Sequence, residues 1–251
     1  MRRARGILAS VHTGDAFGEM LRSFAQDGTG LEIVERDDGF ITASQLGPSM
    51  YLAPYRRWRP VERRAMRFAR GRVLDIGAGA GRVALHLQER GHEVVAIDVS
   101  PGAVELMRER SVRDARLLGI ADVGPELGTF DTVVLYGNNI GLLASPQKGA
   151  RILRRWLKAT SDDARILGTS VFLYDTQDPV HLAYHERNRR RGRHPGQLRL
   201  RIRHGELATP WFDYLILPPD ELDALAREGG WHVTRTFTGD GPIYSAVLEK
   251  L

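Results

Sequence analysis

The sequence predicts an α/β fold built on a doubly wound, mostly parallel sheet that ends in an antiparallel hairpin. Between residues 73 and 172, short apolar segments alternate with amphipathic helical segments. This alternation is typical of parallel strands that are covered by helices on both faces. The last two strand-like segments, 231–237 and 244–251, are separated by a short Gly-Asp-Gly-Pro link. Such a link is too short for a parallel crossover, so these two strands are expected to pair antiparallel.

Composition restricts the class of protein. The chain has 251 residues, 42% of them hydrophobic, which is enough for one large domain. Its net charge is +5, but segment 186–204 holds eight arginines and one acid, which leaves the rest of the chain at −2. This favours a near-neutral domain with one basic segment over a uniformly basic nucleic-acid binder. There is no cysteine, which excludes disulfides and thiolate chemistry.

The basic amino terminus has no apolar run long enough for a signal peptide or a membrane helix. A cytoplasmic protein without membrane contact is therefore expected. Residues 1–50 are predicted to form an extension that consists of one helix, over 14–26, and one hairpin, over 32–44. The turn of that hairpin is expected at Asp37-Asp38-Gly39. Residues 51–251 are predicted to form one ligand-binding domain.

The elements of this domain follow in a regular order. A helix is expected to begin at Pro60 and to end at Gly71. Ser100 and Pro101 are a typical pair for the N-cap and first turn of a helix. Strands are expected at 73–76, 93–98, 115–122, 130–137 and 164–172, and the remaining helices at 82–90, 100–110, 146–159 and 219–228.

A glycine-rich turn follows the first strand of the domain directly, in the segment VLDIGAGAG. A Walker loop needs Lys and then Ser or Thr after its last glycine, but Arg82 and Val83 stand there. A dinucleotide loop would carry its third glycine at the position of Arg82. The large side chain at this position disfavours a dinucleotide. The loop therefore approaches some other ligand.

The order acid-x-Gly-x-Gly-x-Gly, from Asp75 to Gly81, resembles motif I of the class I S-adenosylmethionine-dependent methyltransferases. The resemblance extends from about Tyr51 to the end of the chain. It implies a Rossmann-like fold, S-adenosylmethionine as cofactor, and methyl transfer as the activity. Further matches are the acids that end the second and third strands, the start of the fourth strand, and the reversed last strand: Asp98, Asp122, Phe130-Asp131 and the carboxyl-terminal hairpin.

The chemistry of this cofactor assigns roles to the residues. Asp75 is expected to accept from its ammonium group, and Asp98 from both ribose hydroxyls. The family pattern gives the adenine amino group to Asp122 and a ring nitrogen to the N–H of Val123. Tyr51 or Arg56 is a candidate for the methionine carboxylate, unless this stretch only leads into a helix. The other predicted cofactor contacts are Gly77, Gly79, Gly81, Val99 and Asn138, although Asn138 is equally typical of a left-handed turn.

The long connection after the fifth strand, at about 174–218, is predicted to be a lid over the acceptor. Its first part places His181 and Tyr184 on one helical face, and these are the candidates for acceptor contact or proton removal. A solvated histidine is the alternative for His181. The second part, QLRLRIRHG, indicates a strand with one apolar and one cationic face. The predicted acceptor contacts are Asn139, His185, Asn188, Arg199, Arg201 and Arg203.

Three functions remain open at this stage. The first is methyl transfer by in-line displacement to an oxygen or nitrogen of a small, anionic acceptor. The second is an RNA methyltransferase that places the arginines of 187–203 on phosphates, but nothing before residue 50 is large or basic enough for an RNA module. The third is a non-catalytic cofactor-binding protein or partner subunit. The expected partner is a small molecule rather than nucleic acid, and no metal site is indicated.

Overall fold

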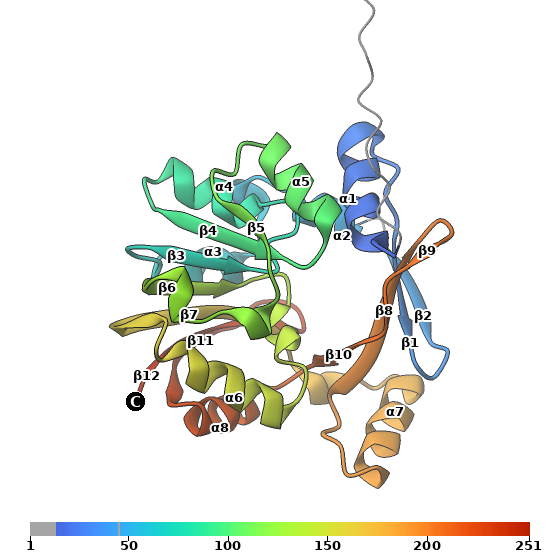
Figure 1. Cartoon of the computed structure of the whole chain (residues 1–251). Helices are drawn as coiled ribbons and strands as arrows, with labels where there is room; N and C mark the ends of the chain where they lie inside the picture. The colour runs from blue at the N-terminus through green and yellow to red at the C-terminus, as the bar shows by residue number, and fades with distance from the viewer. Residues whose placement is uncertain (1–13, 45) are drawn as a thin grey trace, which may run out of the picture.

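The computed structural model describes residues 14–44 and 46–251, without the side chain of Leu46. The first 13 residues and Gln45, which belong to the predicted extension, lie outside the described residues. Two sheets face one another, one of seven strands and one of five (Figure 1). Among the helices of the described ranges, none is long and apolar enough to cross a membrane.

The seven-stranded sheet confirms the predicted fold class. Its order is β11-β12-β7-β6-β3-β4-β5, and the pairs from β7 to β5 are all parallel. β12 pairs antiparallel with β7 and β11. Because the chain winds outward in both directions from β3, its carboxyl edge has a switch point between β3 and β6. The strands are β3 (Val73–Ile76), β4 (Val94–Asp98), β5 (Ala115–Leu117), β6 (Phe130–Leu135), β7 (Thr160–Val171), β11 (Trp231–Phe237) and β12 (Ile243–Lys250).

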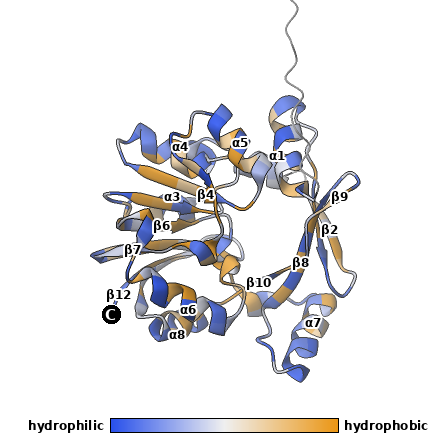
Figure 2. Ribbon diagram, viewed as in Figure 1, coloured by the Kyte–Doolittle hydropathy of each residue, from blue (hydrophilic) through white to orange (hydrophobic). Residues whose placement is uncertain are grey.

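Helices cover both faces of this sheet. One face packs against α3 (Pro60–Met66), α4 (Arg82–Glu89) and α5 (Pro101–Glu109), and the other against α6 (Pro146–Trp156) and α8 (Pro219–Glu228). Successive strand residues point to opposite faces, so Val73 belongs to one buried core and Leu74 to the other. The central strands β3, β4 and β6 are correspondingly buried and mostly apolar (Figure 2).

Three element boundaries differ from the sequence prediction. α3 ends at Met66 rather than near Gly71, because the following N–H groups bond three residues back in a tightened turn. The predicted strand 115–122 ends at Leu117, and residues 120–122 form the 3₁₀ turn η2 (Ile120–Asp122). β5 is an edge strand that pairs with β4 alone. The second half of the predicted strand, residues 118–122, therefore has no neighbouring strand to pair with. β7 begins earlier than predicted, at Thr160, where it pairs with Phe130.

The five-stranded sheet joins two distant parts of the sequence. The hairpin of β1 (Glu32–Arg36) and β2 (Ile41–Ser44) is confirmed, as is the strand β8 (Gln197–His204). β8 pairs antiparallel with β1 on one side and with β10 (Phe212–Leu215) on the other, and the short β9 (Leu207–Ala208) pairs with β8. The predicted boundary at residue 50 therefore divides two segments that share one sheet.

Helices close the two ends of the space between the sheets (Figure 1). α1 (Ala16–Asp27) and α2 (Leu46–Tyr51) lie at one end, and α7 (Pro179–Arg190) at the other. Asp15 fastens α1 to the main body. Its Oδ1 caps α1 by accepting from the N–H of Gly18, and its Oδ2 accepts from Ser100 Oγ and the N–H of Gly102. α1 is therefore held beside the start of α5, at the carboxyl edge of the large sheet.

Candidate functional site

The loop between β3 and α4 contains three glycines with left-handed backbone. Their φ angles are 64° at Gly77, 55° at Gly79 and 75° at Gly81. A Cβ on Gly77 would lie 2.5 Å from Asn139 Nδ2, and a Cβ on Gly81 would lie 2.7 Å from a methyl group of Val112. A Cβ on Gly79 would find its nearest atoms, on α1, at 3.8–3.9 Å. Gly77 and Gly81 are thus closed in by the protein, whereas a Cβ on Gly79 would make only ordinary van der Waals contact with α1.

Asp98 holds this loop in place from the end of β4. Its Oδ2 accepts from the N–H of Gly79 and its Oδ1 from the N–H of Ser100, both at 2.9 Å. The side chain is only 6% exposed, and burial raises the pKa of its carboxyl group despite the two N–H donors. Each carboxylate oxygen can accept more than one hydrogen bond, so both oxygens retain capacity for hydroxyl groups of a ligand.

Asp75 stands at the neighbouring strand end and is less well satisfied. Its side chain is 2% exposed, and its Oδ2 has no hydrogen-bond partner within the described part of the chain. Burial raises the pKa of this carboxyl group to about 7, although the nearby charge of Arg82 opposes the change. A buried acceptor without a donor costs free energy. An ammonium group of a ligand would supply both the donor and the countercharge.

The two asparagines after β6 differ: the protein engages the side-chain amide nitrogen of Asn139, whereas Oδ1 of Asn138 is buried without a hydrogen-bond partner among the described residues. Asn139 Nδ2 donates to the carbonyl oxygens of Ile76 and Gly77, at 3.0 and 2.9 Å. It therefore braces the glycine loop, and its amide nitrogen is not available to an acceptor. Asn138 adopts the left-handed backbone considered from the sequence, with φ of 69°. Its carbonyl oxygen accepts from the hydroxyl of Tyr214 at 2.5 Å, which joins β10 to this edge.

Val99 and the two residues expected at the adenine, Asp122 and Val123, follow the ends of β4 and β5. A Cβ on Gly119 would lie 3.0 Å from Oδ2 of Asp122 and 3.6 Å from Cγ1 of Val99. The side chain of Val99 is 72% exposed, which is unusual for a residue that follows a buried strand. Asp122 is also exposed, while Val123 is buried in the core. Val99 and Asp122 therefore flank one accessible patch.

Tyr51 and Arg56 are not equivalent. Tyr51 packs edge-to-face on Phe17 of α1, and a Cβ on Gly137 would lie 4.0 Å from its ring. The ring of Tyr51 therefore lies between α1 and the end of β6. Its hydroxyl donates to Oε1 of Glu32 at 2.8 Å. Arg56 is exposed on the 3₁₀ turn η1 (Tyr55–Arg57).

His181 and Tyr184 lie against the tip of the β1–β2 hairpin. Nδ1 of His181 is 3.0 Å from Nη1 of Arg36, and because Arg has no acceptor this ring nitrogen must accept. Tyr184 is 2% exposed, and its hydroxyl donates to Oδ1 of Asp37 at 2.6 Å. Burial raises the pKa of Tyr184 to about 12, which opposes a role as a base. Both side chains are engaged in attaching α7 to the hairpin.

The other two predicted contacts on α7 are also buried within the protein. His185 is 5% exposed and packs edge-on to Tyr174, and burial lowers its pKa. Asn188 is 1% exposed. Its Nδ2 donates to the carbonyl oxygens of Pro195 and Gln197, which closes the turn between α7 and β8.

The arginines of β8 form ion pairs along one face of the small sheet. Glu35 accepts from Arg201 through both oxygens, at 2.9 Å each, and from Arg203 at 2.9 Å. Arg199 pairs with Asp213 on β10 at 3.3 Å. Strand pairing places these residues on the opposite face from Tyr214, which contacts the large sheet. The cationic face predicted from the sequence is present, but it turns away from the glycine loop.

Sequence reasoning missed two of the residues at this edge. Glu32 and Tyr214 come from β1 and β10, and each contacts a partner that is distant in the sequence. A local pattern carries no signal for such contacts. Taken together, the site has a buried carboxylate oxygen without a partner at Asp75, further acceptor capacity at Asp98, and a loop position at Gly79 that the protein does not crowd. These features fit a nucleoside ligand that carries an amino-acid group.

Comparison with known proteins also indicates a nucleoside ligand that carries an amino-acid group. Residues 73–160 match the family described as a methyltransferase domain. A methyltransferase from Bacteroides fragilis, solved with S-adenosyl-L-homocysteine, superposes with a TM-score of 0.79 and 26% identity. The match covers 96% of this chain and 98% of that one. The CcbJ methyltransferase of Streptomyces caelestis has a TM-score of 0.58 at 16% identity, over 80% of this chain and 98% of that chain, which indicates a shared fold.

Curated relatives match over shorter segments. The magnesium-protoporphyrin O-methyltransferase of Rhodobacter capsulatus is 37% identical over 67 residues, which are 25% of this chain and 30% of the relative. The ubiquinone biosynthesis O-methyltransferase of Xanthomonas euvesicatoria is 35% identical over 74 residues, 27% of this chain and 31% of the relative. The chain thus spans less than a third of the length of either relative.

The ion pairs of β8 predict a structural role for its arginines. Changing Arg199, Arg201 and Arg203 together to Gln should lower the melting temperature by a few degrees, because Glu35 and Asp213 lose their partners. Thermal unfolding at low and high salt would measure this. The matched control changes Arg189, Arg190 and Arg191 on the exposed side of α7 to Gln. A fall in melting temperature no larger than that of the control would contradict the prediction.

Proposed function

We propose that this chain, a class I methyltransferase that uses S-adenosylmethionine as cofactor, transfers the methyl group to a small-molecule acceptor. The atom that receives the methyl group is a nitrogen or an oxygen. The observation that carries the proposal is the pair of buried carboxylates, Asp75 and Asp98, on either side of a glycine loop whose middle glycine, Gly79, is not crowded by the protein.

These residues would hold the cofactor as follows. Asp75 would accept from the ammonium group through its unpartnered Oδ2, and Asp98 would accept from the ribose hydroxyls while it keeps its two N–H donors. Val99 and Asp122 would flank the adenine. The bound cofactor supplies a methyl group on a positively charged sulfur. The side chains of Phe17 and Leu21 on α1 would exclude water above the loop.

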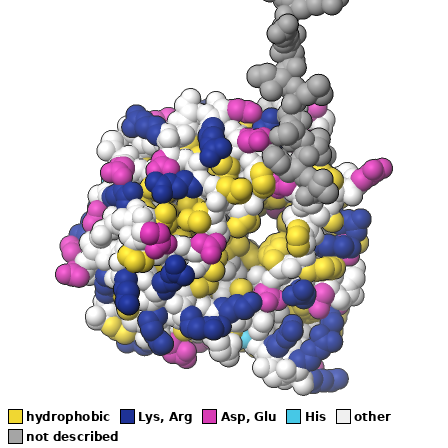
Figure 3. Space-filling view, viewed as in Figure 1, with side chains coloured by type: hydrophobic (Ala, Val, Ile, Leu, Met, Phe, Trp, Pro, Cys, Tyr) yellow, Lys and Arg dark blue, Asp and Glu magenta, His cyan; other side chains and the backbone are white. Residues whose placement is uncertain are grey.

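The acceptor would enter the space between the two sheets. Hydrophobic side chains gather around a hollow there (Figure 3), in front of the carboxyl edge where ligands of open parallel sheets bind. Alignment of the nucleophile with the methyl group would supply much of the rate enhancement. Two relatives support a small-molecule acceptor by their names: the Rhodobacter protein is a magnesium-protoporphyrin O-methyltransferase, and the Xanthomonas protein is a ubiquinone biosynthesis O-methyltransferase.

The charge distribution argues against two of the acceptors considered from the sequence. An anionic acceptor and an RNA backbone were both inferred from the arginines of segment 187–203. The three of these arginines that stand on β8 pair with Glu35 and Asp213 on the face that turns away from the glycine loop. The proposal therefore keeps a small-molecule acceptor and leaves out its predicted negative charge.

Binding tests this proposal directly. Calorimetry should detect binding of S-adenosylhomocysteine and none of NAD, because Arg82 occupies the third glycine position of a dinucleotide loop. Incubation with S-adenosylmethionine and a cell extract should then yield S-adenosylhomocysteine and a product heavier by one methyl group, which mass spectrometry can detect. NAD binding without a response to S-adenosylhomocysteine would refute the cofactor assignment. Cofactor binding without any turnover would favour the non-catalytic alternative.

Asp98 would bind the ribose and also holds the glycine loop, so its removal should affect both cofactor binding and stability. Asp98→Ala should weaken binding of S-adenosylhomocysteine by about 2–4 kcal/mol, because hydrogen bonds from the ribose to a charged acceptor are lost together. The N–H of Gly79 also loses its acceptor, so the melting temperature should fall even without ligand. Asp114→Ala is a suitable control, since this acid lies on the edge of the same sheet and pairs with Arg116. An unchanged dissociation constant for Asp98→Ala would place the ribose elsewhere.

The pKa of Asp75 predicts a pH dependence. Its raised pKa of about 7 means that the carboxyl group is protonated below neutral pH in the absence of ligand, whereas an ammonium group favours the ionised form. Affinity for S-adenosylhomocysteine should therefore fall as pH drops below 7, by up to about tenfold per unit. Calorimetry in buffers of different ionisation enthalpy would reveal the released proton. Asp75→Asn should bind weakly at every pH, and a wild-type affinity that is constant from pH 5.5 to 8 would refute this role.

A further inference from the structure

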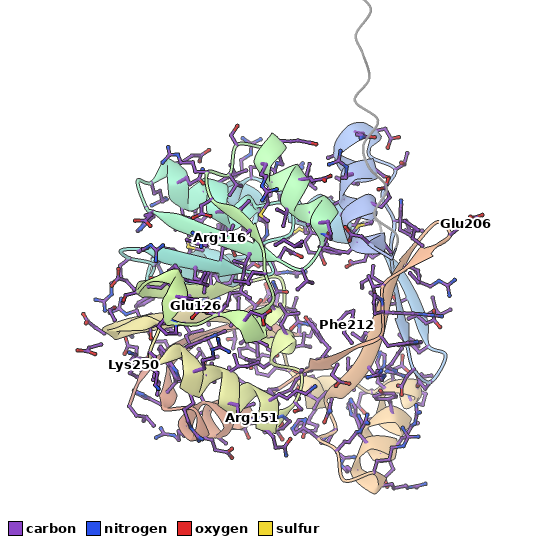
Figure 4. All side chains as sticks on the ribbon, viewed as in Figure 1. Arg116, Glu126, Arg151, Glu206, Phe212 and Lys250 are labelled. Carbon is purple, nitrogen blue, oxygen red and sulfur yellow. The ribbon has the colours of Figure 1, made fainter. Side chains whose placement is uncertain are left out.

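The inner face of the small sheet is the side that looks toward the large sheet, and it is mainly apolar. Strand pairing places this face opposite the arginines. Tyr214 identifies its direction, because the hydroxyl reaches the carbonyl of Asn138 and the ring packs on Gly141. Phe212 points the same way (Figure 4). The apolar residues of the inner face, all partly buried, are Val34, Leu198, Leu200, Ile202 and Phe212.

One carboxylate lies on the inner face, at the end nearest the carboxyl edge of the large sheet. Glu32 is the first residue of β1, two positions before Val34 and on the same side of the strand. Its Oε1 accepts from the hydroxyl of Tyr51, whose ring stands beside Gly137 at the end of β6. Burial raises the pKa of Tyr214, and the charge of Glu32 adds to this effect.

Among the described residues, no cation forms an ion pair with this carboxylate. Within the ranges 14–44 and 46–251, Glu32 takes part in no ion pair, whereas Glu35 on the outer face has two. Arg36 is the inner-face cation of β1, but it lies at the far end, pairs with Asp38 and stacks on Tyr184. A partly buried carboxylate with a single neutral donor is incompletely compensated. A ligand with a positive charge or an N–H group would supply the missing hydrogen bond and countercharge to Glu32.

We propose that the methyl acceptor is an amine with an apolar skeleton, and that Glu32 binds its nitrogen. The proposal rests on the proposed methyl transfer and names its substrate class. The skeleton packs on the apolar residues of the inner face. In the reaction, the nitrogen gives up a proton to the carboxylate of Glu32, and its lone pair forms the new N–C bond. Oε1 of Glu32 already accepts from Tyr51, and Oε2 lies against Gly47 of α2 without a hydrogen-bond donor among the described residues. The electron pair of the broken C–S bond stays on sulfur.

Charge decides between an amine and the other small acceptors. A carboxylate or phosphate group would be repelled by Glu32 and would meet no free cation on this face. An alcohol could donate one hydrogen bond to Glu32, but it would leave the negative charge unbalanced. Only an amine combines donors with a countercharge, and charged pairs with hydrogen bonds are stronger than neutral ones. The apolar wall excludes strongly hydrated polyamines as preferred ligands.

The test uses three probes with one carbon skeleton: 2-phenylethylamine, 2-phenylethanol and phenylacetate. Each is titrated calorimetrically into the full-length protein saturated with S-adenosylhomocysteine. The amine should bind at least tenfold more tightly than the alcohol, and the acid should not bind measurably. With S-adenosylmethionine, the amine should be the probe that gains a methyl group, as shown by mass spectrometry.

Two variants on one strand separate Glu32 from a general effect of charge. Glu32→Gln should lose the preference for the amine, while Glu35→Gln, on the outer face of the same strand, should keep it. Equal binding of the amine and the alcohol by the wild-type protein, or binding of neither, would overturn the proposal without any variant. A Glu32→Gln protein that still prefers the amine would do the same. Absence of S-adenosylhomocysteine binding would instead contradict the proposed function itself.

Discussion

The carboxyl edge of the large sheet depends on the bridge that Asp98 makes between two backbone N–H groups. One belongs to Gly79 of the glycine loop and the other to Ser100 at the start of α5. Ser100 then caps α5 and donates its hydroxyl to Asp15, which begins α1. A continuous chain of hydrogen bonds therefore fixes the positions of the glycine loop, α5 and α1 relative to one another. A ligand that bonds to Asp98 contacts the residue on which all three depend.

A second buried group explains why this loop carries Arg82 in place of a third glycine. Arg82 is 9% exposed, and its two terminal nitrogens donate to the two oxygens of Glu62 at 3.2 and 2.6 Å. Its guanidinium group also lies over the ring of Trp58. The pair ties α3 to the start of α4, on the side away from Gly79. The same charge lowers the pKa of Asp75 against the effect of burial, so a structural ion pair also tunes a group at the cofactor site.

The parts of the fold that the sequence could predict are those with local causes. Buried strands, helix caps and the glycine loop each follow from a few neighbouring residues, and the sequence predicts β3, β4 and the caps of α5 and α6 to within a residue or two. The small sheet could not be predicted, because β1 and β8 pair across a separation of 166 residues at Glu35 and Arg201. For the same reason, the sequence predicts Tyr184 and Asn188 as contacts of the methyl acceptor, although both side chains donate hydrogen bonds within the protein. A polar side chain in a periodic pattern does not reveal whether the protein or a ligand satisfies it.

The predicted alternation of arginine and apolar residues along β8 is present in the structure. Which of its two faces points toward the large sheet depends on the register of strand pairing. Arginines occupy one set of alternate positions and leucine or isoleucine the other, so a slip by one residue would exchange the two faces. Arg201 opposite Glu35 sets the register, because its two hydrogen bonds to one carboxylate can form only there. The ion pairs therefore keep the cations outside and the apolar side chains inside. The pairing that removes the arginines from the site is the same pairing that gives the inner face its apolar character and leaves Glu32 as its uncompensated charge.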